Sequence, residues 1–214
     1  YEQLLQTAFL RHPYRNPVIG FEEDLRRLTA TAAAAHQRRF YVAANLVVAL
    51  VGDIDPERDL ALLEGCFGKI PAAPPPAAAH LAEPAPDRER RVVVRRRAAP
   101  RLLAAYHKPV YPHPDDAALT VMGEILAGGR ISRLYRDLVQ YHRLATAVDC
   151  YEAPGSRFPN LLVFDLKTES GRGNAALLAA FDRVVAQFKR RPPKAEAVSY
   201  THLRAHETPE HLVC

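Results

Sequence analysis

Histidine is the side chain of this sequence best suited to bind a metal or move a proton near neutral pH. His12, His107 and His113 each lie next to or near prolines in predicted loops. A zinc site in a short segment needs a second ligand three to five residues away, and His12 has none there. We interpret all three histidines as structural, hydrogen-bonding residues. The chain is therefore predicted to contain no catalytic and no metal-binding residue.

A second group of histidines lies in the last seventeen residues, which read VSYTHLRAHETPEHLVC from Val198 to Cys214. This string resembles the translation of an adapter used in DNA sequencing libraries. Such segments are excluded before the fold is considered. We therefore set aside a zinc site built from this tail, whose candidate ligands are His202, His206, Glu207 and His211.

The three cysteines, Cys66, Cys150 and Cys214, are too few and too widely spaced for a disulfide framework or a Cys-x-x-Cys metal site. They leave the redox compartment open. No apolar run is long enough for a membrane span, and the sequence opens at Tyr1 on a polar helical pattern rather than on a basic-then-apolar leader. The location, periplasmic or cytoplasmic, is therefore unknown, and a start at Tyr1 without Met leads us to expect that the true N-terminus lies upstream.

The formal net charge is +5, and the most basic stretch, Arg88–Arg97, places six arginines around Val92–Val94. A groove for single-stranded nucleic acid normally interleaves aromatic side chains with basic ones. This stretch has no aromatic residue and no recognition motif accompanies it. A β-strand with solvated ends is the simpler interpretation, and a basic nucleic-acid-binding module remains a distant alternative.

The elements that must position these residues fall into two portions, separated by a stretch with six prolines from Pro71 to Pro86. Few large apolar side chains occur there, so the stretch is predicted to be a semi-rigid linker. We predict four regions: the end of a first domain over 1–73, a linker over 74–88, the start of a second domain over 89–197, and the adapter-like tail over 198–214.

In the first portion, helices are predicted for Tyr1–Phe9 and Phe21–Phe40, and a buried strand for Leu46–Val51. Asp55 and Pro56 then begin a further helix as its cap and first residue. In the second portion, paired strands are followed by paired helices, rather than single strands alternating strictly with helices. The predicted strands are Arg91–Arg95, Leu102–Tyr106, Ala145–Cys150 and Leu161–Lys167; helices begin at Pro114, Ser132 and Asn174. The fold class is therefore α+β, with helices packed on a mostly antiparallel sheet.

Short motifs in a fixed order resemble the pitrilysin/insulinase family of zinc metallopeptidases, the inverzincins. The end of that family's catalytic domain is matched by His12-Pro13-Tyr14, Phe40-Tyr41 to Asn45, Gly52-Asp53 and Phe67-Gly68-Lys69-Ile70-Pro71. The start of its next, non-catalytic domain is matched by Tyr106-His107-Lys108-Pro109, Gly128-Gly129-Arg130, Ser132-Arg133-Leu134-Tyr135 and Leu144-Ala145. The resemblance implies an internal fragment containing pieces of two homologous domains.

The resemblance also implies which residues are missing. The family needs a His-x-x-Glu-His helix, in which two histidines bind zinc and the Glu activates water, and a further Glu ligand. None is present, and Glu2 lies too close to the His-Pro-Tyr loop to be that ligand. Where some members carry an Arg and a Tyr that hold substrate, this chain has Val139 and Thr146.

From the resemblance we expect a fragment of a zinc-dependent endopeptidase that hydrolyses peptides or small unfolded proteins. Its zinc site would lie outside this chain, so zinc belongs to the parent protein and the fragment itself is expected to be inactive. The partners implied are a peptide substrate and a second homologous half that closes a chamber. The alternative is a fragment of a non-catalytic homologue that acts as a partner subunit or scaffold.

Overall fold

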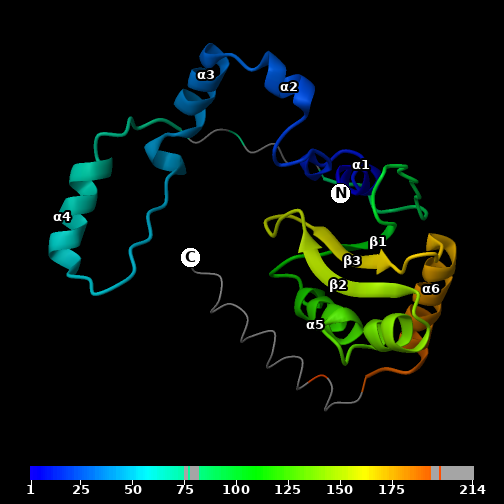
Figure 1. Cartoon of the computed structure of the whole chain (residues 1–214). Coiled ribbons are helices and arrows are strands. Elements are labelled where there is room, and N and C mark those ends of the chain that lie inside the picture. The colour runs from blue at the N-terminus through cyan, green and yellow to red at the C-terminus, as the bar shows by residue number, and fades with distance from the viewer. Residues whose placement is uncertain (75–76, 78–81, 194–197, 199–214) are drawn as a thin grey trace. The chain divides into compact units, whose positions relative to one another are not determined.

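The strands of the molecule form a three-stranded antiparallel sheet in the order β1-β3-β2 (Figure 1). In this computed structural model the described residues are 1–74, 77, 82–193 and 198. The strands are β1 (Arg101–Lys108), β2 (Ala145–Ala153) and β3 (Asn160–Thr168). Three of the five predicted strands are therefore present, and the α+β class with helices on an antiparallel sheet is confirmed.

The central strand β3 is apolar on both faces because helices cover the sheet from two sides (Figure 1). Leu162, Phe164 and Leu166 point to one face, where they pack with helices α5 (Asp115–Ala127) and α6 (Asn174–Arg190). Leu161 and Val163 point to the other face. There they contact the short helix α1 (Glu2–Ala8).

Helix α6 follows the predicted apolar stripe: Leu177, Phe181 and Val184 are buried, and Phe188 packs at the edge of the same core. Between α5 and β2 the chain forms a π-helix, η3 (Tyr135–Tyr141). A π-helix closes each turn with a hydrogen bond between residues i and i+5, so its turn holds one residue more than that of an α-helix. The helix predicted from Ser132 onward is therefore wider than an α-helix over Tyr135–Tyr141.

Two compact units make up the chain: unit 1 is Tyr1–Asn16 with Glu83–Cys214, and unit 2 is Pro17–Ala82. Unit 1 contains the sheet, its helices and the 3-10 turn η1 (Pro13–Arg15). Unit 2 contains three α-helices and the 3-10 turn η2 (Ala43–Asn45). Its helices are α2 (Glu22–Arg27), α3 (Ala30–Phe40) and α4 (Pro56–Phe67).

Side-chain caps explain where two helices of unit 2, α3 and α4, begin. The Asp55 carboxylate accepts hydrogen bonds from the backbone N–H groups of Glu57 and Arg58, both at 3.1 Å, and Pro56 is the first helical residue. Thr29 caps α3 in the same way through the N–H of Ala32. Among the described residues of this unit only Pro17, Val42 and Asp59 are buried.

Two predicted strands are wrong. Leu46–Val51 and Arg91–Arg95 are extended but belong to no strand. A strand is defined by the hydrogen bonds it exchanges with a neighbour, and no described residue pairs with either run. Val47 and Val51 are 93% and 94% exposed, where the apolar pattern predicted burial.

The compact units are drawn differently from the domains predicted from the sequence. Residues Tyr1–Asn16, placed in the first domain by the prediction, pack with the sheet of unit 1, since Leu5 and Phe9 share a core with Leu161 and Val163. The division at residues 74–88 concerns the parent protein and stays a prediction. Parts of that linker, and nearly all of the adapter-like tail with its four candidate ligands, lie outside the described residues.

Candidate functional site

The three histidines weighed as ligands each make a hydrogen bond with the backbone. His12 Nδ1 accepts from the N–H of Tyr14 at 3.2 Å, and its ring lies against Phe9 and Phe158. His113 Nδ1 accepts from the N–H of Asp115, also at 3.2 Å.

The ring of His107 is the third case, and it lies edge-on to Phe9. Its Nε2 is 3.1 Å from the carbonyl oxygen of Ala8 and must donate to it, because a carbonyl oxygen only accepts. The interpretation of these histidines as hydrogen-bonding residues is therefore confirmed. Within the described part of the chain, no group of three or more His, Cys, Asp or Glu side chains could hold a metal ion.

The most buried charged group is Lys108, at the end of β1, with 1% of its side chain exposed. Its Nζ donates to Asp116 in the first turn of α5 and lies 2.9 Å from Oε1 of Glu152 on β2. Thr120 Oγ1 donates to the same Glu152 oxygen at 2.6 Å. Asn160, the register partner of Lys108, completes the group.

Asn160 links this network to the turn between β2 and β3. Its Nδ2 donates to the carbonyl of Gly155 at 2.8 Å and to Glu152 Oε2 at 3.4 Å. Its Oδ1 is buried with no partner among the described residues. A buried ammonium held between two carboxylates is costly to break and fixes the three elements that supply it. Because the amine is enclosed, this network can hold the fold together but cannot reach a substrate.

A second ion pair joins the outer strand β1 to the central strand. Both oxygens of the buried Asp165 accept from the guanidinium of Arg101, and this pairing raises the pKa of Arg101. Asn174 Nδ2 donates to the carbonyl of Arg101 at 3.1 Å, and Asn174 Oδ1 accepts from Thr168 at 2.6 Å. This pair, too, has a structural role.

The positions compared with the family's substrate-holding Arg and Tyr are apolar or small here. Val139 is part of η3 and packs at the edge of the core, and Thr146 on β2 donates to the carbonyl of Lys167 at 3.4 Å. Neither side chain has the charge or the phenol needed to hold a peptide. The substrate role is not carried by these two residues.

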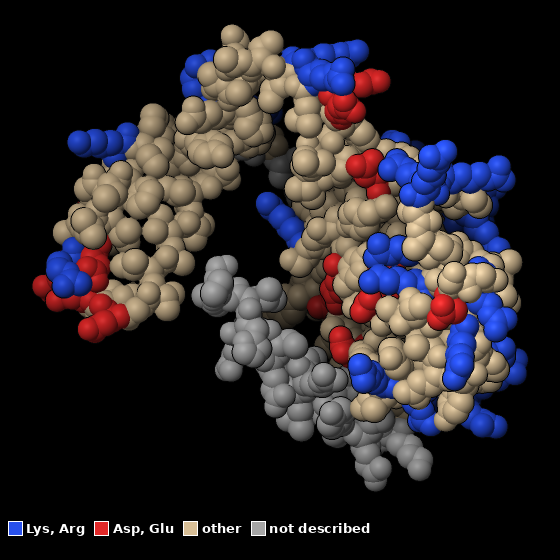
Figure 2. Space-filling view, in the orientation of Figure 1, with Lys and Arg blue, Asp and Glu red and all other residues tan. Residues whose placement is uncertain are grey.

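The basic stretch Arg88–Arg97 lies in unit 1, and some of its arginines are already paired with neighbours. Arg91 pairs with Glu89, and Arg90 pairs with Asp87 at 3.3 Å. In Figure 2, red acidic groups lie among the blue Lys and Arg groups on the visible face of this unit. This distribution is that of a solvated surface of mixed charge.

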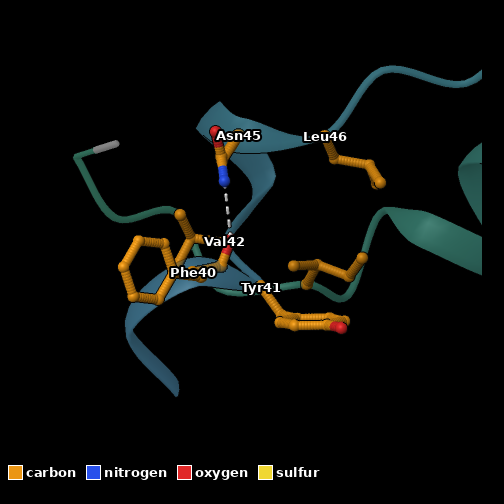
Figure 3. A pocket seen from close by; sticks show the side chains of 6 residues that line it. Phe40, Tyr41, Val42, Asn45 and Leu46 are labelled. Carbon is orange, nitrogen blue, oxygen red and sulfur yellow. Dashed lines mark hydrogen bonds between the residues drawn. The ribbon is translucent and has the colours of Figure 1, made fainter. Parts of the chain in front are cut away.

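Unit 2 has a shallow apolar pocket of about 280 Å³ in the turn after α3 (Figure 3). Asn45 Nδ2 donates to the carbonyl of Phe40 at 2.9 Å and closes the turn. The pocket contains no charged side chain that could orient a substrate; its lining is Phe40, Tyr41, Val42, Asn45, Leu46 and Ile70. None of the described helices is long and apolar enough to cross a membrane.

Sequence reasoning did not find the network around Lys108. Its members come from β1, α5, β2 and β3, and only the folded sheet brings them together. Lys108 was noted as part of a motif, but a lysine before a proline gives no sign of being buried. The one signal available was the apolar run before Lys108, which predicts a strand at Leu102–Tyr106 but does not extend to the lysine.

The comparisons with known proteins agree with the fold. Residues 27–201 match the model of the peptidase M16 inactive domain. The chain is 29% identical over 153 residues to Zinc protease PqqE of Helicobacter pylori, covering 68% of this chain and 34% of that protein. It therefore spans about a third of the length of this curated relative.

Solved structures share the architecture. A protease from Helicobacter pylori superposes with a TM-score of 0.86 at 22% identity, covering 96% of this chain and 50% of that one. The peptidase M16 inactive domain from Pseudomonas fluorescens gives 0.77 at 19% identity, with coverage of 97% and 50%. The resemblance to the pitrilysin/insulinase peptidases is confirmed, and the chain belongs to the peptidase M16 inactive-domain family.

Proposed function

We propose that this chain is a non-catalytic part of a zinc endopeptidase that hydrolyses peptides or small unfolded proteins. The observation that carries the proposal is the match of residues 27–201 to the M16 inactive domain. The curated relative described as a zinc protease supports the reaction class. Because the chain spans about a third of that relative, the activity is proposed for the parent protein.

In this role the chain contributes structure rather than chemistry. Its sheet, with helices on both faces, forms a rigid wall, and its partner is a second homologous half that closes a chamber around a peptide substrate. We propose no nucleic-acid partner, because the basic stretch is part of a surface of mixed charge.

Zinc is proposed for the parent protein and not for this chain. The described residues do not fit a zinc site, because no three of their His, Cys, Asp or Glu side chains converge. His12, His107 and His113 each have a ring nitrogen engaged with the backbone instead. No step of hydrolysis is therefore assigned to a residue of this chain.

The test is to clone the reading frame that contains this chain with the roughly one hundred codons upstream, about one domain. The purified product is assayed for cleavage of a quenched fluorescent peptide with and without a zinc chelator. We expect chelator-sensitive cleavage by the longer protein and none by residues 1–197 alone. Cleavage by residues 1–197 alone, abolished by the chelator, would contradict the proposal.

A non-catalytic homologue is the second candidate, and the observation that favours it is the pair Val139 and Thr146. Val139 lies at the edge of the core, and Thr146 is hydrogen-bonded to the backbone. This domain therefore lacks the two side chains expected to hold substrate. The same cloning separates the candidates. An upstream frame without His-x-x-Glu-His, and a longer protein that binds peptide without cutting it, would favour the scaffold.

A further inference from the structure

The end of helix α1 has backbone carbonyls that the helix itself cannot satisfy, as every helix end has. Side chains from a distant part of the sequence satisfy them. Arg90 Nη1 lies 3.3 Å from the carbonyl oxygens of both Thr7 and Ala8, and His107 Nε2 donates to Ala8 O at 3.1 Å. The exit of α1 is thus capped by two nitrogen donors that are 82 to 99 residues away in sequence.

Just after α1 and its C-cap Phe9, three successive residues direct their backbone N–H groups to a single carboxylate, that of Glu83. The N–H of Leu10 donates to Oε1 at 2.6 Å, while those of Arg11 and His12 donate to Oε2 at 2.9 and 2.8 Å. Successive backbone N–H groups that converge in this way form an anion-binding concavity. Glu83 lies 71 to 73 residues away, so the contact is not a local turn.

The chemistry of this contact requires a carboxylate. A carboxylate shares one negative charge between two oxygens that can together accept three hydrogen bonds, and such charge-assisted bonds are stronger than neutral ones. A glutamine offers one acceptor oxygen and an NH₂ group that cannot accept. Pro84 follows Glu83 and favours an extended backbone at that residue.

We propose that Glu83, Arg90 and His107 form a latch on the exit of α1, in which the backbone of Leu10–His12 is a carboxylate-binding site occupied by Glu83. The latch fixes the chain at Glu83, within the Pro/Ala-rich stretch. It also fixes the His-Pro-Tyr turn to the segment that enters the sheet. Residues predicted to belong to two successive domains are thereby tied across the predicted linker.

Apolar packing does a different job at the same place. Leu5 and Phe9 bury their side chains against Leu161 and Val163 and hold the helix itself on the sheet. Leu10 and Arg11 are exposed and add nothing to that core. Removing the Glu83 carboxylate therefore frees the backbone N–H groups of Leu10–His12 to exchange with solvent. The backbone amides of α1 and β3 stay protected from exchange.

The experiment is hydrogen–deuterium exchange of the full chain read at single amides, comparing Glu83→Gln with Glu89→Gln. Glu89 is the matched control because it is exposed and, among the described residues, its side chain pairs with Arg91 alone, and because its change to Gln removes the same charge six residues away. We expect the amides of Leu10, Arg11 and His12 to exchange at least about tenfold faster in E83Q than in E89Q. The amides of β3 should be unchanged in both.

A second variant tests the binding site directly. In Glu83→Ala the empty site should accept acetate titrated to about 1 M, since a tethered group is replaced by a free one at high concentration. Acetate should restore protection at Leu10–His12, while sodium chloride at equal ionic strength should not. Equal exchange in E83Q and E89Q, no rescue by acetate, or loss of protection throughout β3 would each overturn the latch.

Discussion

Side chains cap the N-termini of α3 and α4 in unit 2 but not those of α1, α5 and α6 in unit 1, yet it is the helices of unit 1 that cover a sheet. In unit 1, α1, α5 and α6 bury apolar residues against a sheet, and β3 is buried on both faces. In unit 2, α4 has a proper cap and an apolar stripe, but Leu60 and Leu62 remain exposed. Local signals therefore suffice to form a helix, whereas a core requires a second surface of matching shape.

The same lesson applies to the strands. Leu46–Val51 is as apolar as β3, and by sequence alone the two runs are equivalent. β3 has antiparallel neighbours on both sides, with β1 and β2 in register along its length. Leu46–Val51 has no partner among the described residues and remains extended and exposed. Four predictions follow from this contrast, from the largest expected effect to the smallest.

The largest effect is expected from removing a phenylalanine ring in each unit. Phe164 on β3 is 1% exposed and packs 5.4 Å from the ring centre of Phe181, while Phe67 at the end of α4 is 40% exposed. Phe164→Ala should lower the free energy of unfolding by about 3–5 kcal/mol, and Phe67→Ala by less than about 1 kcal/mol. Urea unfolding followed by circular dichroism measures both, and equal losses would mean that unit 2 has a core of its own.

The two described cysteines report on the same difference through reactivity. Cys66 in α4 is exposed, whereas burial raises the pKa of Cys150 on β2 to about 12. At pH 8 only about one Cys150 in ten thousand is then a thiolate, the reactive form. We expect a maleimide to label Cys66 at least about a hundredfold faster, read by mass spectrometry on peptides that separate each cysteine. In urea the two rates should become equal, and equality in the native protein would contradict the burial of Cys150.

How far these differences could be predicted depends on whether the signal is local. The cap at Asp55 predicted α4 correctly, because an N-cap acts on N–H groups two and three residues later. The strands around Leu161–Lys167 were also predicted, since turn residues separate paired apolar runs. The strand at Leu46–Val51 was wrong because its apolar pattern carries no information about which segment pairs with it.

The polar contacts were less predictable than the fold. His12 was correctly interpreted as a hydrogen-bonding residue, because its partner Tyr14 is two residues away. Lys108 and Glu152 are separated by more than forty residues, and no spacing rule links them. Glu83 lies in a stretch that was interpreted as a linker because of its prolines. That interpretation gave no indication that the Glu83 carboxylate accepts three backbone hydrogen bonds.

Acid should loosen the exit of α1 within unit 1. Partial burial by itself raises the pKa of Glu83, but the N–H groups of His12, Leu10 and Arg11 and the nearby ring of His107 together lower it below its ordinary value. A carboxyl whose pKa is lower in the folded state stabilises that state above its unfolded pKa of about 4.3 and loses this contribution as pH falls through the folded value.

The measurement is exchange at Leu10–His12 between pH 6 and 3, corrected for the intrinsic exchange rate. We expect protection to be constant above about pH 4.3 and to fall below it in the natural sequence. In Glu83→Gln it should already be low and should not change with pH. A pH dependence that survives in E83Q would show that the effect does not come from Glu83.

The smallest effect is expected from the exposed ion pair of α2 in unit 2. Arg26 Nη2 lies 2.5 Å from Glu22 Oε1, one helical turn away, and both side chains are more than three-quarters exposed. Such pairs contribute only about 0.3–0.5 kcal/mol, because water screens the charges and ordering two long side chains costs entropy. Glu22→Gln should therefore speed exchange at the amides of Arg26 and Arg27 by no more than about 2.5-fold, and half-molar salt should remove the difference. The matching change in unit 1, Asp165→Asn, leaves the Arg101 guanidinium facing a buried neutral group and should have a far larger effect on β3. A tenfold response to Glu22→Gln would show that α2 is buried in solution and that unit 2 resembles unit 1 more closely than its exposed helices indicate.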